Sequence, residues 1–447
     1  MRSRAGNPQF QGILAAVLAA VVVLVGALVL NSLLGSDGDT QDETPTAIAL
    51  VTALPTSADG QTPTVGGTPE ATTASSPEGQ ADAQMTPTPN PNDQWGVVID
   101  SIIDDKSAQM FRSNTSRNGV YKGNAIAEQP ATKWTASLGD ENFSVPAVRG
   151  DKVVVGGNND MLTCLDTATG EVIWQSEARD DISSSPAIGS NRVFFGSFDG
   201  NFYALDLDNG RRKWRFETAG PIHSSPAIDA QIVYFGGYDR VVYAVSIADG
   251  TLVWSGITGG QIQSSPVLTS KLLIIGSDDG YLYAFDRLTG KRRWRFDTGG
   301  KVTATPTIAG NKVFVASESG SIFAVTIRDG KEAWSFDAGS PISFSSPAVS
   351  GETLVVGSDS GIVFGLNDET GEQLWTFEAQ AEVRSSTMIV DGVAYVGSYD
   401  GNLYAIDLDD GSEVWALELG GSVGSPVYAD GVIYVSVNSG DVYALSQ

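Results

Sequence analysis

The chain has 447 residues and a formal net charge of −26, from 53 acidic and 27 basic side chains. That balance argues against a nucleic-acid partner or an anionic lipid surface, because both are bound through basic faces. Cys164 is the only cysteine and His223 the only histidine. An intramolecular disulfide, a Cys- or His-rich metal cluster and a Ser/His relay without His223 are therefore excluded.

The first predicted element is an apolar helix over Gly12–Leu30, which contains no charged residue. A helix of this length rises about 28 Å, close to the thickness of a hydrocarbon core. Arg2 and Arg4 precede it and acidic residues follow, so we predict a cytoplasmic N-terminus over residues 1–11 and a transmembrane anchor over residues 12–30. The protein is then predicted to be a single-pass cell membrane protein, in which the chain after residue 30 lies outside the cytoplasm. A cleaved signal peptide is the alternative, although its apolar region is usually only about 7–15 residues.

Residues 31–94 are rich in Thr, Pro, Ser and Gly, as in "TPTVGGTPEATTASSPEGQ". A segment of this kind buries too little apolar surface to offset its ordering entropy, which predicts a disordered stalk. Residues 95–130 form a lead-in segment, and residues 131–447 form the folded domain. From Ser107 to Gln447 there are 41 acidic and 24 basic residues, so this part is acidic by itself.

Tryptophan recurs every 40 residues along the folded domain, with a single interval of 41. A glycine stands four residues before each of the last seven tryptophans. A fixed period of this length indicates a repeat architecture, in which equivalent residues pack equivalent units together. The series is Trp134, Trp174, Trp214, Trp254, Trp294, Trp334, Trp375 and Trp415.

Each repeat contains four short stretches that are typical of β-strands: an "SSPAI" stretch, a "VYFGS" stretch, an "LYALD" stretch and the stretch around the tryptophan. Asp199-Gly200, Asp279-Gly280 and Asp400-Gly401 supply tight turns between the second and third strands. Four antiparallel strands in about forty residues make one propeller blade.

The chain ends in "DVYALSQ", after a third strand, whereas "ATKWTASLG" around Trp134 is a fourth strand with no partners before it. We therefore predict an all-β, eight-bladed propeller whose last blade is completed by the N-terminal strand. Closing the ring removes the exposed sheet edges of an open array. The eight tryptophans are predicted to dock neighbouring blades on one another.

The pattern "YALD-x-x-x-G-x-x-x-W", with Thr-Gly at Thr169-Gly170, Thr289-Gly290 and Thr370-Gly371, resembles the tryptophan-docking repeat of quinoprotein alcohol dehydrogenase-like propellers. Over Ala108–Gln447 the chain resembles the PQQ-like repeat family, which includes BamB-type assembly scaffolds. "QMFRSNTSRNGVY" is similar to the "W-x-M-F-R…TG" segment that precedes the first blade in that family. Ala108 stands here in place of its tryptophan and Asn118 in place of its threonine.

The resemblance implies two classes of function. Enzymes of the family use pyrroloquinoline quinone, a calcium ion held by carboxylate and amide groups, a catalytic aspartate and often a vicinal cysteine pair. The cysteine pair is absent here, and the constant period leaves little room for the insertions that carry such groups. We therefore predict a monomeric, non-catalytic scaffold without a cofactor, which binds partner proteins on the propeller rim. The alternatives are a quinone- and calcium-dependent oxidoreductase, or a sensor domain that binds a small ligand in the central channel.

The residue three places before each blade's "SSP" proline, or its equivalent, is predicted to lie near one mouth of the channel. His223 and Arg384 fall on opposite blades, which would give a polar, partly cationic pocket for a small anion or an acidic peptide tail. The alternative is an ordinary hydrated channel. An extra residue in "ISFSSP" predicts a bulge from which Phe344 protrudes. The full series is Phe143, Ser183, His223, Gln263, Thr303, Ser343 or Phe344, Arg384 and Val423, of which Ser183, His223, Gln263, Thr303 and Arg384 are the predicted binding residues.

Overall fold

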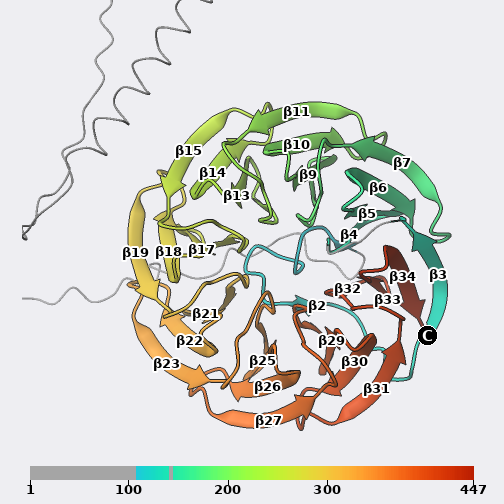
Figure 1. The fold of residues 1–447 in the computed structure, drawn as a ribbon, viewed down its shortest axis with the longest axis vertical. Helices are drawn as coiled ribbons and strands as arrows, with labels where there is room; N and C mark the ends of the chain where they lie inside the picture. Colours follow the sequence, from blue (N-terminus) through green and yellow to red (C-terminus); the bar gives the residue numbers. More distant parts are fainter. Residues whose placement is uncertain (1–106, 140–143) are drawn as a thin grey trace, which may run out of the picture. The chain divides into compact units, whose positions relative to one another are not determined.

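The computed structural model describes residues 107–139 and 144–447, which belong to one compact unit, Thr86–Gln447. Eight β-sheets are arranged around a central channel (Figure 1). Within the described residues there is no helix, and each sheet contains a four-stranded antiparallel blade. The predicted all-β propeller with eight blades is confirmed.

The blades are numbered in chain order, and their strands are given from the channel outward. Blades one to four contain β4 (Ala147–Arg149), β5 (Lys152–Gly156), β6 (Met161–Asp166) and β7 (Val172–Glu177); β8 (Ala187–Gly189), β9 (Arg192–Gly196), β10 (Asn201–Asp206) and β11 (Arg212–Glu217); β12 (Ala227–Ile228), β13 (Ile232–Gly236), β14 (Val241–Ser246) and β15 (Leu252–Ile257); and β16 (Val267–Leu268), β17 (Leu272–Gly276), β18 (Tyr281–Asp286) and β19 (Arg292–Asp297).

Blades five to eight contain β20 (Thr307–Ala309), β21 (Lys312–Ala316), β22 (Ser321–Thr326) and β23 (Glu332–Asp337); β24 (Ala348–Ser350), β25 (Thr353–Gly357), β26 (Ile362–Asn367) and β27 (Gln373–Glu378); β28 (Met388–Val390), β29 (Val393–Gly397), β30 (Asn402–Asp407) and β31 (Glu413–Glu418); and β32 (Val427–Ala429), β33 (Val432–Ser436), β34 (Asp441–Ser446) and β3 (Ala131–Ser137). Two further strands, β1 (Ser107–Ala108) and β2 (Val120–Tyr121), come from the lead-in segment.

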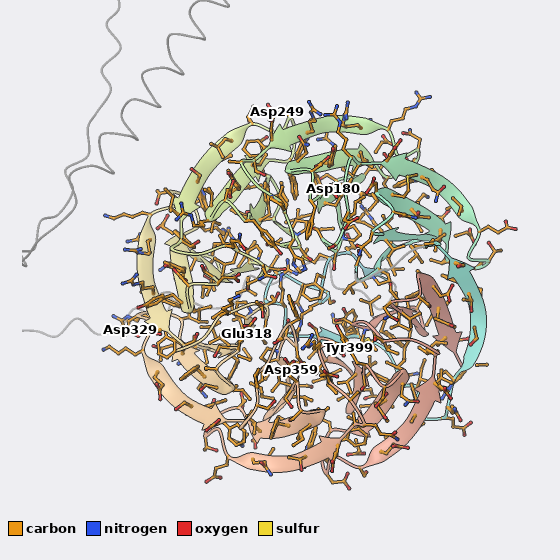
Figure 2. The ribbon with its side chains drawn as sticks, in the orientation of Figure 1. Asp180, Asp249, Glu318, Asp329, Asp359 and Tyr399 are labelled. Carbon is orange, nitrogen blue, oxygen red and sulfur yellow. The ribbon has the colours of Figure 1, made fainter. Side chains whose placement is uncertain are left out.

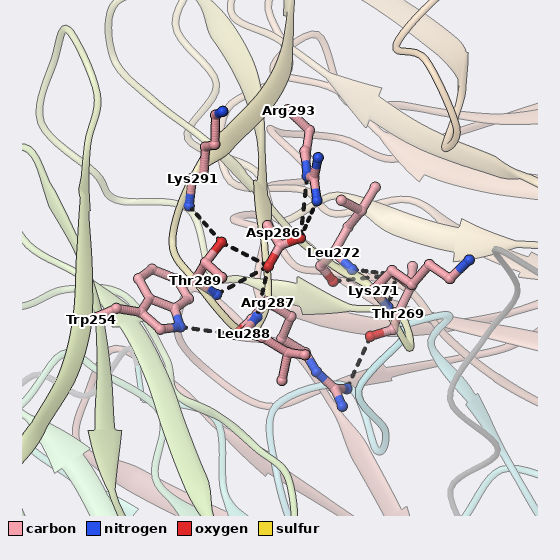
Figure 3. A network of polar contacts seen from close by, with 10 residues as sticks. All are labelled: Trp254, Thr269, Lys271, Leu272, Asp286, Arg287, Leu288, Thr289, Lys291 and Arg293. Carbon is pink, nitrogen blue, oxygen red and sulfur yellow. Dashed lines mark hydrogen bonds and ion pairs between the residues drawn. The ribbon is translucent and has the colours of Figure 1, made fainter. Parts of the chain in front are cut away.

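The turn between the third and fourth strands is fixed by its aspartate, as blade four illustrates (Figure 3). One carboxylate oxygen of Asp286 accepts hydrogen bonds from the backbone nitrogens of Leu288 and Thr289, at 3.2 and 3.0 Å, and from the Thr289 hydroxyl at 2.9 Å. Arg293 pairs with the other oxygen. Gly290 closes the turn with a φ of +69°, a conformation that favours glycine. The Asp residue and the Thr-Gly pair of the repeat therefore serve to form this turn.

The same glycine forms the docking surface for a tryptophan of the preceding blade. A Cβ atom on Gly290 would lie 2.6 Å from the ring of Trp254. The indole nitrogen of Trp254 donates a hydrogen bond to the Arg287 carbonyl at 2.8 Å. Equivalent contacts join Trp134 to Gly170, Trp174 to Gly210, Trp214 to Gly250, Trp294 to Gly330, Trp334 to Gly371 and Trp375 to Gly411.

Trp415 has a different partner, because the outermost strand of blade eight, β3, follows the lead-in segment and not a glycine turn. Its indole nitrogen donates to the carbonyl oxygen of Ile126 at 2.8 Å. The backbone nitrogen of Ile126 in turn donates a hydrogen bond to the Tyr395 hydroxyl at 2.8 Å. The lead-in segment therefore replaces the missing glycine turn.

The ring closes where the sequence predicts. β3 pairs antiparallel with β34, from Ala131 opposite Ser446 to Ser137 opposite Asp441. One more bond, from the Leu138 nitrogen to the Gly440 carbonyl at 2.8 Å, extends the pairing. The N-terminal strand is thus the outermost strand of blade eight (Figure 1).

The lead-in segment also crosses the central channel, which the sequence did not indicate. β1 adds an antiparallel fifth strand to blade one, and β2 adds a parallel fifth strand to blade seven. Between them, backbone carbonyls accept hydrogen bonds from the innermost strands of the intervening blades. These bonds run from Ile188 to Gln109, from Leu268 to Thr115, from Ile308 to Ser116 and from Val349 to Asn118.

Two arginines of this segment are buried at the centre of the ring. Arg117 has no exposed surface, and it donates to the carbonyl oxygens of Pro266 at 2.8 Å, Phe111 at 2.9 Å, Ser225 at 3.0 Å and Pro226 at 2.9 Å. Arg112 donates to the carbonyl of Pro347. Desolvation by burial lowers the pKa of each guanidinium to about 9, so both are charged at neutral pH.

The predictions for residues 1–11, 12–30 and 31–94 lie outside the described residues, as does the first part of the lead-in segment. In the part of the chain that the structure describes, there is no helix with the length and apolar character needed to span a membrane.

Candidate functional site

The candidate site is a cavity of about 290 Å³ in the central channel. Phe111 lines it and comes from the lead-in segment that crosses the channel. Tyr399 comes from the turn between β29 and β30, and the other lining residues come from the segments that enter the innermost strands of the blades. The volume is at the lower end of the range of small-molecule pockets.

The structure brings most of the predicted channel-mouth residues to this one cavity. Ser343 is not among the residues that line it, and Phe143 lies outside the described residues. Whether any of them binds a ligand stays a prediction. The residues of the predicted series that line the cavity are Ser183, His223, Gln263, Thr303, Phe344, Arg384 and Val423.

Phe344 shapes the mouth of the cavity. It has a φ of +65°, which is uncommon for a residue with a side chain, and more than a third of its surface is exposed. Its ring centroid lies 5.8 Å from that of His223 in blade three. The extra residue of blade six therefore lets Phe344 reach His223, whose ring also contacts Phe198 at 6.3 Å between centroids.

Arg384 is not a free cation. Its guanidinium donates to both carboxylate oxygens of Asp359, at 3.1 and 3.2 Å, and lies 5.5 Å from the ring centroid of Tyr399. The hydrogen bonds to Asp359 raise the pKa of Arg384, and desolvation by burial opposes this shift only in part. Figure 2 labels Asp359 and Tyr399 close to the channel. The pocket is therefore less cationic than the sequence alone suggested.

The surroundings of His223 disfavour the charged form of its ring. Its Nδ1 lies 3.4 Å from the Gln263 carbonyl and donates to it in the Nδ1–H tautomer. Desolvation by burial lowers the pKa of His223, and the bond to Gln263 and the charge of Asp278 only partly oppose this. Gln263 is itself fixed by the carboxylate of Asp278 at 2.9 Å.

Below this mouth, a belt of seven hydroxyl groups lines the cavity, one from each of blades two to eight. Each hydroxyl oxygen accepts a hydrogen bond from a backbone N–H of the preceding blade. The pattern recurs because a serine or threonine occupies the same place at the entry to the innermost strand, usually just before a proline. The bonds run from Val145 to Ser185, Ser185 to Ser225, Ser225 to Ser265, Ser265 to Thr305, Thr305 to Ser346, Ser346 to Ser386 and Ser386 to Ser425, at 2.8–3.2 Å. We call these seven side chains the hydroxyl belt.

The donor set of the cavity does not fit the calcium ion of a quinone enzyme. Calcium takes six to eight oxygen ligands, among them carboxylates, and no described residue that lines the cavity is acidic. Asp160, Asp180 and Asp181 place carboxylate oxygens within 4.8 Å of one another, but these residues do not line the cavity. A cluster of this kind is also common on acidic surfaces without an ion.

The outer wall of blades two to four carries a second notable surface. β15, the outermost strand of blade three, contains no charged residue and exposes Leu252, Val253 and Ile257, which are 50%, 48% and 71% exposed. The outermost strands on either side, β11 and β19, are basic (Figure 1). We call this surface the basic–apolar wall; its basic residues, all exposed, are Arg211, Arg212, Lys213, Arg215, Lys291, Arg292, Arg293 and Arg295.

This wall was not predicted, although its signal is visible in the sequence as "RRKWRFE", "TLVWSGI" and "KRRWRFD". Lys213 and Arg293 form ion pairs with Asp206 and Asp286, which leaves six of the eight basic side chains without such a partner on the same turn. One third of the basic residues between Ser107 and Gln447 thus lie on two outer strands and the residue before each, in an acidic domain.

A family model described as "Outer membrane protein assembly factor BamB" matches residues 124–265 and 238–447. Among curated proteins, no match to the chain is found.

Solved structures with the same architecture include the BamB protein of Moraxella catarrhalis, at 20% identity and a TM-score of 0.61, over 71% of this chain and all of that one. They also include the quinohemoprotein alcohol dehydrogenase of Comamonas testosteroni, at 15% identity and a TM-score of 0.68, over 77% of this chain and 81% of that one. A europium-containing methanol dehydrogenase matches at 14% identity and a TM-score of 0.66, over 77% of this chain and 98% of that one. At these identities the likeness shows the fold alone.

Proposed function

Because the chain belongs to the BamB family of propellers with PQQ-like repeats, we propose that it is a non-catalytic scaffold that binds partner proteins. In this proposal the apolar segment at residues 12–30 anchors the chain in the cell membrane, and the propeller lies outside the cytoplasm. The propeller acts as a monomer and uses its rigid outer surface.

The observation that carries this proposal is the basic–apolar wall. An exposed apolar strand between two basic strands combines the features of a protein interface: apolar contact area in the centre and charged groups at the border. Since the rest of the domain is acidic, the wall can select partners by charge. The partner surface we infer is an acidic segment that carries apolar side chains.

The connections between strands support a rigid scaffold. In the described repeats, the third and fourth strands are joined by short turns closed by a glycine, as at Gly210, Gly290 and Gly411. Such turns offer no loop that would fold over the channel as a lid. An oxidoreductase with quinone and calcium is the competing function, and alcohol-dependent dye reduction after addition of both would establish it.

A photo-crosslinking amino acid placed at position 252 tests the proposal in cells that produce the full chain. Leu374 is the matched control, because it also lies on an outermost strand and is 49% exposed, compared with 50% for Leu252. We expect a discrete crosslinked product from position 252 and not from position 374. Reversing the flanking charges with Arg292→Glu and Arg295→Glu should reduce that product several-fold, because in this proposal both arginines attract the acidic partner electrostatically.

Equal crosslinking from positions 252 and 374 would contradict the proposed interface. A product at position 252 that is unchanged by the two charge reversals would contradict the acidic partner while leaving the apolar contact in place.

A further inference from the structure

The hydroxyl belt differs from a hydrated channel wall in that its donors are oriented. Each belt oxygen already accepts a backbone N–H bond, so its own proton is the group left to face the cavity. Serine and threonine hydroxyls can donate one hydrogen bond in addition to those they accept. The belt therefore presents donors, and the backbone fixes this polarity.

The bulge in blade six makes the belt asymmetric. The carbonyl oxygen of Phe344 accepts hydrogen bonds from the hydroxyls of Ser346 and Ser386, both at 3.4 Å. By contrast, four belt hydroxyls in consecutive blades have no acceptor for their protons among the described residues. These four, each at most 6% exposed, are Ser185, Ser225, Ser265 and Thr305. A row of four free donors thus faces the cavity from blades two to five.

The charges around the cavity favour an anion, although the carboxylates of Asp278 and Asp359 bind Gln263 and Arg384 of its lining. No described residue that lines it is acidic, although this part of the chain has 41 acidic residues. The Arg117 guanidinium lies 5.3 Å from the ring centroid of Phe111, which lines the cavity. Arg112 and Arg117 are bound by backbone carbonyls, and neither has an ion pair with a described carboxylate.

The rest of the lining combines polar side chains, among them Gln263 and Thr303, with four apolar ones. Phe111, Val145, Phe344 and Val423 line the same cavity, and Val145 stands in blade one where the other blades have a hydroxyl. A simple inorganic ion would leave these side chains without a partner. A ligand that fits both sides has an acceptor-rich, negative end and a short apolar body.

We propose that the cavity binds a carboxylate carried on a short apolar group, with the carboxylate oxygens on the hydroxyls of Ser185, Ser225, Ser265 and Thr305. This site goes beyond the scaffold function and does not depend on the outer wall. Two sources share this chemistry: a free organic acid, and the C-terminus of a peptide with an apolar last residue.

The first test uses calorimetric titration of the purified full-length chain with 3-phenylpropionate and with 3-phenylpropionamide, which has the same shape without the charge. We expect saturable binding of the acid and at least about tenfold weaker binding of the amide, because hydrogen bonds to a charged acceptor are the stronger ones. Equal affinity for the two probes would overturn the proposal. The peptide Gly-Gly-Phe, with a free or an amidated C-terminus, separates the sources: binding of the free form shows that a peptide end can enter.

The second test removes two donors from the belt. In the double variant Ser225→Ala and Ser265→Ala we expect affinity for 3-phenylpropionate to fall at least about tenfold. The matched control is Ser225→Thr with Ser265→Thr, which keeps both hydroxyls and copies the residue already present at Thr305; its affinity should stay within about threefold of the unmodified chain. If the alanine variant binds the acid as well as the threonine variant does, the belt is not the site. If the alanine variant does not fold, the comparison of acid and amide on the unmodified chain still decides.

Discussion

Replacing Arg117 with alanine is expected to lower the free energy of unfolding by about 3–5 kcal/mol. The substitution removes four hydrogen bonds to carbonyl groups of the channel wall and of Phe111. It also leaves a cavity in a position with no solvent exposure. Each unsatisfied buried acceptor costs about 1–3 kcal/mol, and removal of a desolvated charge offsets only part of that sum. The loss is large compared with the stability of a typical domain, about 5–15 kcal/mol.

Two further variants identify the cause of this loss in denaturant unfolding of the full chain. Arg117→Met fills most of the volume without the hydrogen bonds, and it should remain at least about 2 kcal/mol less stable than the unmodified chain. Arg215→Ala removes an exposed arginine of β11 and should change stability by no more than about 0.5 kcal/mol. If Arg117→Met were as stable as the unmodified chain, the carbonyl bonds would not hold the lead-in segment in the channel.

Replacing Trp254 with alanine is the second large effect, with an expected loss of about 3–5 kcal/mol. The indole is 7% exposed, packs on Gly290 in the next blade and donates to the carbonyl of Arg287. Its loss therefore removes contacts between blades three and four as well as within blade three, where Tyr234 lies 6.0 Å away between ring centroids.

The matched control is Leu252→Ala, two residues earlier on the same strand. Leu252 is 50% exposed, so its truncation should change stability by no more than about 0.5 kcal/mol. Similar losses from the two substitutions, measured by denaturant unfolding, would mean that the repeated tryptophans do not carry the packing between blades.

The blades and their closure could be predicted from the sequence because both depend on local, repeated signals. The 40-residue spacing of Trp174, Trp214 and Trp254 sets the blade period, and turn residues such as Asp286 and Gly290 mark where strands end. The incomplete last repeat and the spare strand at Trp134 then left a single way to close the ring.

The course of the lead-in segment could not be predicted in the same way. Residues 107–130 carry no period, and their hydrogen bonds go to blades that are far away in sequence, as from Arg117 to Pro266. A buried arginine bound by carbonyls has no sequence signal that separates it from an exposed one. The hydrogen bond from Trp415 to Ile126 could not be predicted from the sequence for the same reason.

The candidate site was partly visible in the sequence. Counting back from each proline identified residues that line the cavity, such as His223 and Arg384, but it did not show that Asp359 pairs with Arg384. The hydroxyl belt was not predicted, although its serines are periodic, because the same spacing also fits side chains that only begin a strand. Its polarity depends on bonds between neighbouring blades, which sequence spacing does not reveal.

The closure of the ring by the N-terminal strand is tested most directly by a disulfide between β3 and β34. Ser137 lies opposite Asp441, and directly opposed residues are about 4.5–5.5 Å apart between Cα atoms, within the range for a disulfide. Cys164 is buried, so it should not compete for the introduced thiols.

Mild oxidation of the full chain carrying Ser137→Cys and Asp441→Cys, followed by electrophoresis without reductant, should give a monomer with an internal crosslink. The offset pair Ser137→Cys and Tyr443→Cys should not crosslink, because diagonal neighbours lie about 7–8 Å apart. A chain in which the first pair stays reduced, or in which both pairs crosslink equally, would contradict an eight-bladed ring closed by its own N-terminal strand.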